Sequence, residues 1–278
     1  MVDHARHDEP ELRPEDRAFL DWLLLRKGIN PAHYRRETLA RRFQACLRAL
    51  RSSSVAQARG AVERNGRLLD TALNALLIGV TSFFRDERAF AALRDVALPQ
   101  LPASPEALRV WSVGCSDGAE LYSVAMLLAE RGTLRRCELL GTDCRADAVR
   151  AAAAGRFSAA AVRAAIPVQL AERYIRPGKT GDEHHIAAEL RERTRWHVAD
   201  VLQRPEPGPW DLILCRNMAI YLRSTTVVKL WDALHEQLRP GGFLLVGKSE
   251  RPAPAHGRFV NVAPCLYRRE TPAGETNS

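Results

Sequence analysis

The chain has 278 residues, 46% of them hydrophobic, which is enough material for two globular domains. Its apolar runs are too short to span a membrane, and its charged start lacks the apolar core of a secretory signal, so we expect a cytoplasmic protein without membrane insertion. Six cysteines without a C-x-x-C pair predict neither a metal site nor a disulfide framework, whereas a net charge of +8 favours an anionic partner.

Helices dominate the first part of the chain. We expect residues 1–14 to be disordered and residues 15–80 to form a small all-α domain, because turn and cap residues separate its helix-like stretches. The predicted helices span residues 15–27, 36–50, 55–64 and 67–78. Apolar residues recur every three or four positions in the second of these helices and predict its buried face: Leu39, Phe43, Cys46, Leu47 and Leu50.

The same part of the chain carries a concentrated basic excess. From Arg26 to Arg67 there are eleven Lys and Arg residues against two Glu. A surface of this kind attracts an acidic partner, although a solvated helix face is the usual alternative for a run of charge. Nucleic acid is disfavoured because the run lacks interleaved aromatic side chains and no DNA-reading motif is evident. Four arginines fall mainly outside the apolar face of the 36–50 helix: Arg35, Arg41, Arg42 and Arg48.

After this domain we expect a linker over residues 81–107, which includes the proline-bearing connector 98–105. Strands and helices then alternate over residues 108–270, and a tail follows at 271–278. Alternation of this kind predicts an α/β domain with a Rossmann-like, doubly wound and mostly parallel sheet. Its predicted strands span 108–113, 138–142, 195–199, 212–215, 243–247 and 265–268, and its predicted helices span 119–130, 146–154 and 226–237.

The ligand site of such a sheet lies at the carboxyl ends of its strands. The residues at or directly after the predicted strand ends are Gly114–Glu120, Thr142–Asp143, Asp200, Arg216–Asn217 and Lys248–Glu250. Asp143 follows Gly118 by 25 residues (143 minus 118), close to the offset of ~20 at which an acid binds a cofactor ribose.

The turn Gly114-Cys-Ser-Asp-Gly118 permits three interpretations. It matches the G-x-S-x-G nucleophile elbow of serine hydrolases, it suits the close approach of a nucleotide-like cofactor, and it is also an ordinary tight turn that needs glycine. A hydrolase based on Ser116 needs a later acid and histidine, which Asp200 or Asp211 and His256 could supply. The acid after the second strand favours a ribose-bearing cofactor, and the missing third glycine of G-x-G-x-x-G disfavours a dinucleotide.

Five motifs follow one another along the chain: Thr81-Ser-Phe-Phe-Arg-Asp86, Gly114-Cys-Ser-Asp-Gly-Ala-Glu-Leu-Tyr-Ser123, Gly141-Thr-Asp143, Cys215-Arg-Asn-Met-Ala-Ile-Tyr221 and Leu238-Arg-Pro-Gly-Gly242 followed by Gly247-Lys-Ser-Glu250. In these motifs, and over almost its whole length, the chain resembles the CheR family of chemotaxis receptor methyltransferases. The resemblance implies an S-adenosylmethionine-dependent methyltransferase domain, with S-adenosylhomocysteine as product, behind a helical N-terminal domain. It also implies methylation of glutamate side chains on an acidic helical region of a chemoreceptor.

The resemblance implies roles for residues on both sides of a cofactor. Arg216 and Tyr221 would serve the acceptor side as catalytic residues, and the four arginines named above would bind the receptor. A small β-subdomain would lie near residues 174–195, and the protein would be a monomer. The implied cofactor-binding residues are Thr81, Arg85, Gly114, Gly118, Glu120, Asp143, Asp200, Val201, Arg216 and Asn217.

Several positions depart from the family pattern. Ala119 and Leu121 stand where Glu and Pro are common, Asp200-Val201 where Asn-Leu is more frequent, and Lys248 where His is common. Two alternatives to an active methyltransferase therefore stay open. One is a regulator that binds S-adenosylmethionine without catalysis, and the other is the serine hydrolase based on Ser116.

Overall fold

The computed structural model describes residues 12–77, 79, 81–101, 107–252 and 259–270. Residues 1–11 of the expected disordered start 1–14, the tail 271–278 and residues 102–105 of the proline-bearing connector lie outside the described residues. Residues 12–14 are described, and the first helix begins at Pro14. The chain divides into two compact units. The helical unit contains the described residues up to 77 together with Tyr221–Arg223, and the α/β unit contains the others.

The helical unit is built from α1 (Pro14–Leu25), η1 (Pro31–His33), α2 (Arg36–Ala49), α3 (Val55–Arg64) and α4 (Arg67–Leu76). Polar side chains start two of these elements: Asn30 Oδ1 accepts the amide of Ala32 at 2.9 Å, and Ser54 Oγ accepts that of Gln57 at 3.3 Å. The four predicted helices are confirmed. The predicted apolar face of α2 is buried throughout.

Residues 87–100, within the predicted linker, are helical and belong to the α/β unit. They form α5 (Glu87–Ala92), the π-helical η2 (Leu93–Ala97) and α6 (Leu98–Gln100). Phe90, Leu93 and Leu98 are buried in the core of that unit. Pro99 suggested a break in the sequence, but it lies in the first turn of α6, where a missing N–H is tolerated.

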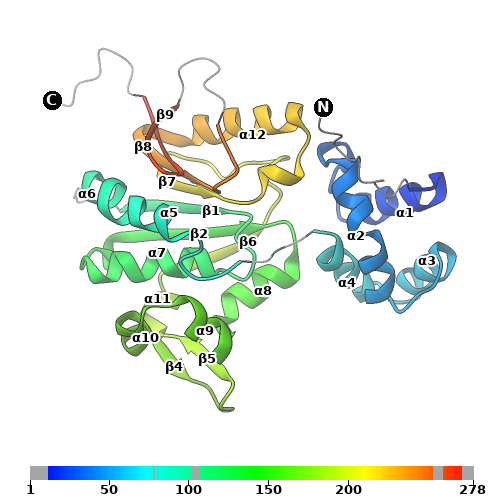
Figure 1. Ribbon diagram of the computed structural model, residues 1–278, viewed down its shortest axis with the longest axis horizontal. Helices are drawn as coiled ribbons and strands as arrows, with labels where there is room; N and C mark the ends of the chain where they lie inside the picture. The colour runs from blue at the N-terminus through cyan, green and yellow to red at the C-terminus, as the bar shows by residue number, and fades with distance from the viewer. Residues whose placement is uncertain (1–11, 78, 80, 102–106, 253–258, 271–278) are drawn as a thin grey trace, which may run out of the picture. The chain divides into compact units, whose positions relative to one another are not determined.

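The α/β unit contains a seven-stranded sheet in the order β6-β2-β1-β7-β8-β10-β9. The first five strands of this order are parallel, and β10 is antiparallel to both of its neighbours. Helix α12 (Ser224–Gln237) lies on one side of the sheet, and α7 (Ala119–Glu130) and α8 (Ala146–Ala154) lie on the other (Figure 1). The predicted doubly wound fold is therefore confirmed. The strands are β1 (Leu108–Val113), β2 (Cys137–Asp143), β6 (Thr194–Val198), β7 (Trp210–Cys215), β8 (Leu238–Val246), β9 (Phe259–Ala263) and β10 (Leu266–Arg269).

Alternating side chains divide the strands of this sheet between its two faces. Val110, Leu139 and Leu212 point into the core that includes Leu121 and Val124 of α7. Because both faces are covered by helices, the central strands are apolar on both sides.

A second, three-stranded antiparallel sheet has the order β3-β5-β4. Its strands β4 and β5 lie inside the range given for the β-subdomain, whereas β3 precedes it. The sheet comprises β3 (Arg156–Ser158), β4 (Ile175–Pro177) and β5 (Glu183–Ile186), and α9 (Ala159–Ala165) and α10 (Val168–Tyr174) pack against it. Two further short helices of the unit are η3 (Leu134–Arg136), directly before β2, and α11 (Ala188–Arg191), after β5. Within the described part of the chain, no helix has the length and apolar character needed to cross a bilayer.

Candidate active site

The carboxyl ends of the parallel strands bring the sequence motifs together. The register pairs Val113 of β1 with Thr142 of β2 on one side and with Cys215 of β7 on the other. The residues that follow these positions therefore meet at one edge of the sheet. This edge holds the turn 114–118, Asp143, and Arg216 with Asn217.

The turn after β1 uses its two predicted glycines differently. Gly114 has φ of +63° and an exposed backbone, as the approach of a ligand requires. Gly118 has φ of +85° and is buried, and a Cβ there would come within 2.5 Å of the Trp196 ring. A Cβ at Gly141 would meet the same ring at 2.4 Å. Packing of Trp196 against the turn is therefore sufficient reason for glycine at position 118.

Ser116, the nucleophile of the hydrolase hypothesis, has φ of +52° and is buried. Its Oγ donates a hydrogen bond to the carbonyl oxygen of Gly79 at 2.7 Å. A triad serine donates to its histidine instead. His256, the histidine considered for that role, lies outside the described residues. Ser116 thus closes the turn against the backbone of Gly79.

Asp143 ends β2 with a carboxylate that is 5% exposed and fully engaged. Its Oδ2 accepts the amide of Ser116 at 3.0 Å and Nη2 of Arg145 at 3.1 Å. Its Oδ1 accepts the amide and Nε of Arg145 at 2.9 and 3.0 Å. These four donors match the roughly four lone-pair positions of an ionised carboxylate. The sequence did not reveal this partner of Asp143, since an arginine two residues along the chain is not part of any motif.

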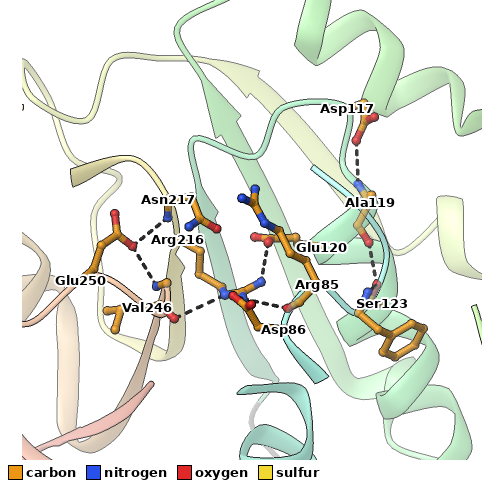
Figure 2. Close-up of polar contacts among 12 residues, drawn as sticks. Arg85, Asp86, Asp117, Ala119, Glu120, Ser123, Arg216, Asn217, Val246 and Glu250 are labelled. Atoms are coloured by element: carbon orange, nitrogen blue, oxygen red, sulfur yellow. Dashed lines mark hydrogen bonds and ion pairs between the residues drawn. The ribbon is translucent and has the colours of Figure 1, made fainter. Parts of the chain in front are cut away.

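Arg216, directly after β7, is the centre of a buried charged cluster (Figure 2). Its Nη1 is paired with Glu120 of α7, and its Nη2 donates to Asp86 Oδ2 and to the carbonyl oxygen of Arg85, both at 2.8 Å. Its Nε donates to the carbonyl oxygen of Val246 at 3.4 Å. Every nitrogen of this guanidinium thus has a partner inside the protein, and the cluster joins β7, β8, α7 and the segment 81–86.

Burial raises the pKa of Glu120 to about 7, and the guanidinium groups of Arg216 and Arg85 oppose this rise. The segment that carries Arg85 is attached to α7 by a second contact. Ser123 Oγ accepts the amide of Phe84 at 3.0 Å and donates to the carbonyl oxygen of Ala119 at 2.8 Å. Ser123 of α7 therefore holds the segment 81–86 directly, and Glu120 does so through Arg216.

Glu250 anchors the loop that follows β7. Its carboxylate is 3% exposed and accepts three backbone amides, those of Asn217 and Ala219 at 2.7 Å and that of Gly247 at 2.8 Å. Figure 2 shows the carboxylate beside Asn217. Glu250 was among the strand-end candidates, but no role was predicted for it, because two of its three amide partners lie 31 and 33 residues earlier in the chain.

Two buried oxygen atoms at this site have no hydrogen-bond partner among the described residues: Thr81 Oγ1 and Asn217 Oδ1. Buried polar atoms are normally satisfied, so each marks a place where a polar ligand atom would fit. Both residues are predicted cofactor contacts. Together with the exposed backbone of Gly114, these residues fit a polar ligand at this edge of the sheet.

Asp200 and Val201 follow β6. The Asp200 carboxylate accepts the amide of Leu202 at 2.9 Å and Nε2 of Gln203 at 3.2 Å, so it caps a local turn. Val201 is buried, and the amide of Ala199 donates to the carbonyl oxygen of Asp143 at 3.0 Å. The two positions are thus attached to the end of β2. Lys248 is exposed.

The four predicted receptor-binding arginines all lie in the helical unit, and they differ in their contacts. Arg41 and Arg48 are exposed on α2. Arg42 is half-buried, and its Nε donates to the carbonyl oxygen of Ala75 at 3.1 Å. Arg35 donates through Nε to Leu222 at 2.7 Å. Tyr221, the predicted acceptor-side residue, is half-buried and is also part of the helical unit.

The doubly wound sheet, its exposed turn after β1 and the acid that ends β2 are typical of Rossmann-like domains that bind a nucleotide-like cofactor. A family model described as "CheR methyltransferase, SAM binding domain" matches residues 79–264. The chain belongs to the CheR family.

Relatives support this membership over most of the chain. The chemotaxis protein methyltransferase of Listeria monocytogenes is 29% identical over 225 residues, which cover 81% of this chain and 85% of the relative. Chemotaxis protein methyltransferase 1 of Pseudomonas aeruginosa is 28% identical over 217 residues, 74% of this chain and 79% of the relative. Among solved structures, the N-methyltransferase NodS of Bradyrhizobium japonicum with S-adenosyl-L-homocysteine covers 59% of this chain and 62% of its own, with 20% identity and a TM-score of 0.35.

Proposed function

We propose that this protein transfers a methyl group from S-adenosylmethionine to glutamate side chains of chemoreceptors and so forms glutamate methyl esters. The observation that carries the proposal is the convergence of motif residues at one sheet edge, where the buried oxygens of Thr81 and Asn217 have no hydrogen-bond partner in the described part of the chain. The chemotaxis methyltransferases that it resembles support the receptor substrate. We place the reaction in the cytoplasm.

We assign the cofactor to the strand ends. Gly114 offers an exposed backbone, and Gly118, Asp143, Asp200 and Val201 frame the ribose and adenine side of the site. Thr81, Arg85, Glu120 and Asn217 frame the methionine side, where the Arg85 guanidinium suits a carboxylate group. When bound, S-adenosylmethionine supplies an electrophilic methyl group on its sulfonium.

Two roles were predicted for Arg216, and we propose the one on the cofactor side. Its side chain has no exposed surface, and all its nitrogens are bonded within the protein. An acceptor carboxylate could reach it only by displacing Glu120, Asp86 or a backbone carbonyl. Arg216 therefore fixes Glu120 and the segment 81–86 around the cofactor.

The chemistry of the acceptor asks little of a catalytic base. A glutamate with a pKa of ~4.3 is already ionised at neutral pH, so its oxygen is a competent nucleophile. What the reaction requires is an acceptor oxygen held in line with the methyl group and shielded from water. We propose that Tyr221 orients this carboxylate through its hydroxyl group.

We assign the receptor contact to the basic helical unit. Exposed Arg41 and Arg48 of α2 carry charges that complement the acidic helices of a receptor methylation region. Charge complementarity of this kind mainly accelerates encounter and sets register.

The test is a methyl-transfer assay with a cytoplasmic chemoreceptor fragment and S-adenosylmethionine labelled in its methyl group. We expect label in the receptor that is released by mild base, as a glutamate methyl ester requires, and that is absent when the methylated glutamates are replaced by alanine. Calorimetric titration with S-adenosylhomocysteine runs in parallel. Cofactor binding without label in any receptor fragment would favour the regulator that lacks catalysis. Labelling of Ser116 by an active-site phosphonate, without cofactor binding, would favour the hydrolase.

A further inference from the structure

The loop that follows β7 takes part in both units. The chain leaves the α/β unit after Ile220, contributes Tyr221–Arg223 to the helical unit, and returns to the α/β unit at Ser224, where α12 begins. We call these three residues the strap. Since Tyr221 belongs to the strap, the contacts of the strap decide where this tyrosine is held.

The strap is bound to residues 33–35 by main chain and side chains together. Tyr34 and Leu222 form an isolated antiparallel bridge. The amide of Arg35 donates to the carbonyl oxygen of Tyr221, and the amide of Arg223 donates to that of His33, both at 2.9 Å. The two segments thus exchange main-chain hydrogen bonds in the manner of paired strands.

Two guanidinium groups reinforce this pairing from opposite sides. Arg35 Nε donates to the carbonyl oxygen of Leu222 at 2.7 Å, and Arg223 Nε donates to the carbonyl oxygen of Tyr34 at 3.0 Å. Each arginine therefore binds the backbone of the other's segment. The side chain between them, Leu222, is 1% exposed. Charge-assisted bonds of this kind are stronger than neutral ones.

The other end of the same loop is held within the α/β unit. Glu250 accepts the amides of Asn217 and Ala219, so only Ile220 separates the last residue bound by Glu250 from the first residue of the strap. The strap therefore begins two residues after a main-chain position that is held within the α/β unit, and its own contacts lie within the helical unit.

Arg223 also lines a pocket of the helical unit. The pocket has a volume of about 480 Å³, and Arg17 and Arg36 and the acids Asp21 and Glu37 line it as well. A side chain that entered this pocket would therefore touch a strap residue directly. Tyr221 lies only two residues earlier in the chain.

We infer that Arg35 and Arg223 are positioning residues, which fix Tyr221 by holding the strap on the helical unit. This inference rests on the proposed function, in which the helical unit binds the receptor and Tyr221 orients its glutamate. In this arrangement the unit that receives the substrate also sets the position of the tyrosine. Arg35 accordingly acts through the strap rather than by direct contact with the receptor.

The test compares the double variant Arg35→Ala/Arg223→Ala with Arg64→Ala, which removes an exposed charge from α3 of the same unit. We expect kcat for methylation of a receptor fragment to fall roughly tenfold in the double variant, with KM changed less than kcat and the S-adenosylhomocysteine Kd unchanged. An unchanged kcat, or a raised KM alone, would overturn the inference. The second outcome would mean that the arginines bind the receptor.

Hydrogen exchange tests the strap without any substrate. If the double variant does not fold, Arg35→Lys/Arg223→Lys keeps the charges but loses the guanidinium geometry. We expect amides of residues 221–223 to exchange roughly tenfold faster in either double variant, with no change at Ala219 or at residues 247–250. Equal exchange at 221–223 would overturn the positioning role. A wild-type protein that shows this protection but methylates no receptor would overturn the proposed function alone.

Discussion

Arginines in the two units of this protein have opposite environments. Arg216 of the α/β unit is buried, and its guanidinium contacts two carboxylates and two backbone carbonyls. Arg41 and Arg48 of α2 are exposed on the helical unit. A buried charge is costly unless it is fully paired, whereas an exposed charge costs little and acts over distance. Arginine therefore fixes neighbouring groups in the α/β unit, whereas in the helical unit it provides exposed positive charge that attracts acidic groups.

Removal of Arg216 from the buried charged cluster should have the largest effect. Arg216→Ala leaves Glu120 and Asp86 without their partner, and we expect the free energy of unfolding to fall by about 3–5 kcal/mol. Arg48→Ala, the matched control, should change it by less than about 0.5 kcal/mol. Urea denaturation of the two variants measures both values. A loss below about 1 kcal/mol for Arg216→Ala would mean that water reaches the cluster.

The pKa of Glu120 gives a pH signature of the same cluster. Because the folded value of about 7 lies above the ordinary 4.5, the folded state holds this proton more tightly. The resulting stability is fully present below pH 4.5 and is lost as the pH rises through 7. Relative to Glu120→Gln, which does not titrate, the wild type should lose up to roughly 3 kcal/mol over this window. A difference between the two proteins that stays constant from pH 4.5 to 7.5 would contradict the raised pKa.

At Asp143, an arginine competes with the proposed ligand, because Arg145 occupies the carboxylate that the ribose would bind. All four acceptor positions of Asp143 are in use, so ribose hydroxyls must displace the Arg145 side chain. We expect Arg145→Ala to bind S-adenosylhomocysteine a few-fold more tightly, and Asp143→Ala to bind it roughly 10–100-fold more weakly. Calorimetric titration measures both. Weaker binding by Arg145→Ala would show instead that this arginine orients the carboxylate for the ribose.

Much of the fold could be predicted because its signals are local. The 3.6-residue spacing of Leu39, Phe43 and Leu47 determines the buried face of α2, and the alternation of apolar strands with helices determines the parallel sheet. Helices α5 and α6 were missed because both lie within the predicted linker 81–107, α6 at the start of its proline-bearing connector. Strand β3 was missed because three residues, Arg156–Ser158, are too few for a period to show.

The sequence predicted where the residues of the candidate site lie but did not predict which residues they contact. Strand ends indicated Gly114, Asp143, Arg216 and Asn217, because parallel strands place their carboxyl ends at one edge. The partners of these residues follow no local rule. Glu250 reaches amides 31 and 33 residues away, and Trp196 packs against Gly118 and Gly141 from β6, which pairs with β2 in the sheet but comes much later in the chain. Contacts of this kind depend on the folded backbone, so no spacing in the sequence contains them.

Removal of the exposed arginines of α2 should have the smallest effect. Arg41→Ala/Arg48→Ala should leave kcat and the S-adenosylhomocysteine Kd unchanged, since neither side chain is proposed to touch the reacting groups. We expect KM for an acidic receptor fragment to rise a few-fold at low salt, because rim charges mainly speed association. The difference from wild type should shrink as salt rises to about 0.5 M, where screening shortens the reach of exposed charges. Steady-state methylation at several salt concentrations measures this trend. A KM difference that persists at high salt would mean that these arginines are desolvated on binding, as Arg216 already is in the folded protein.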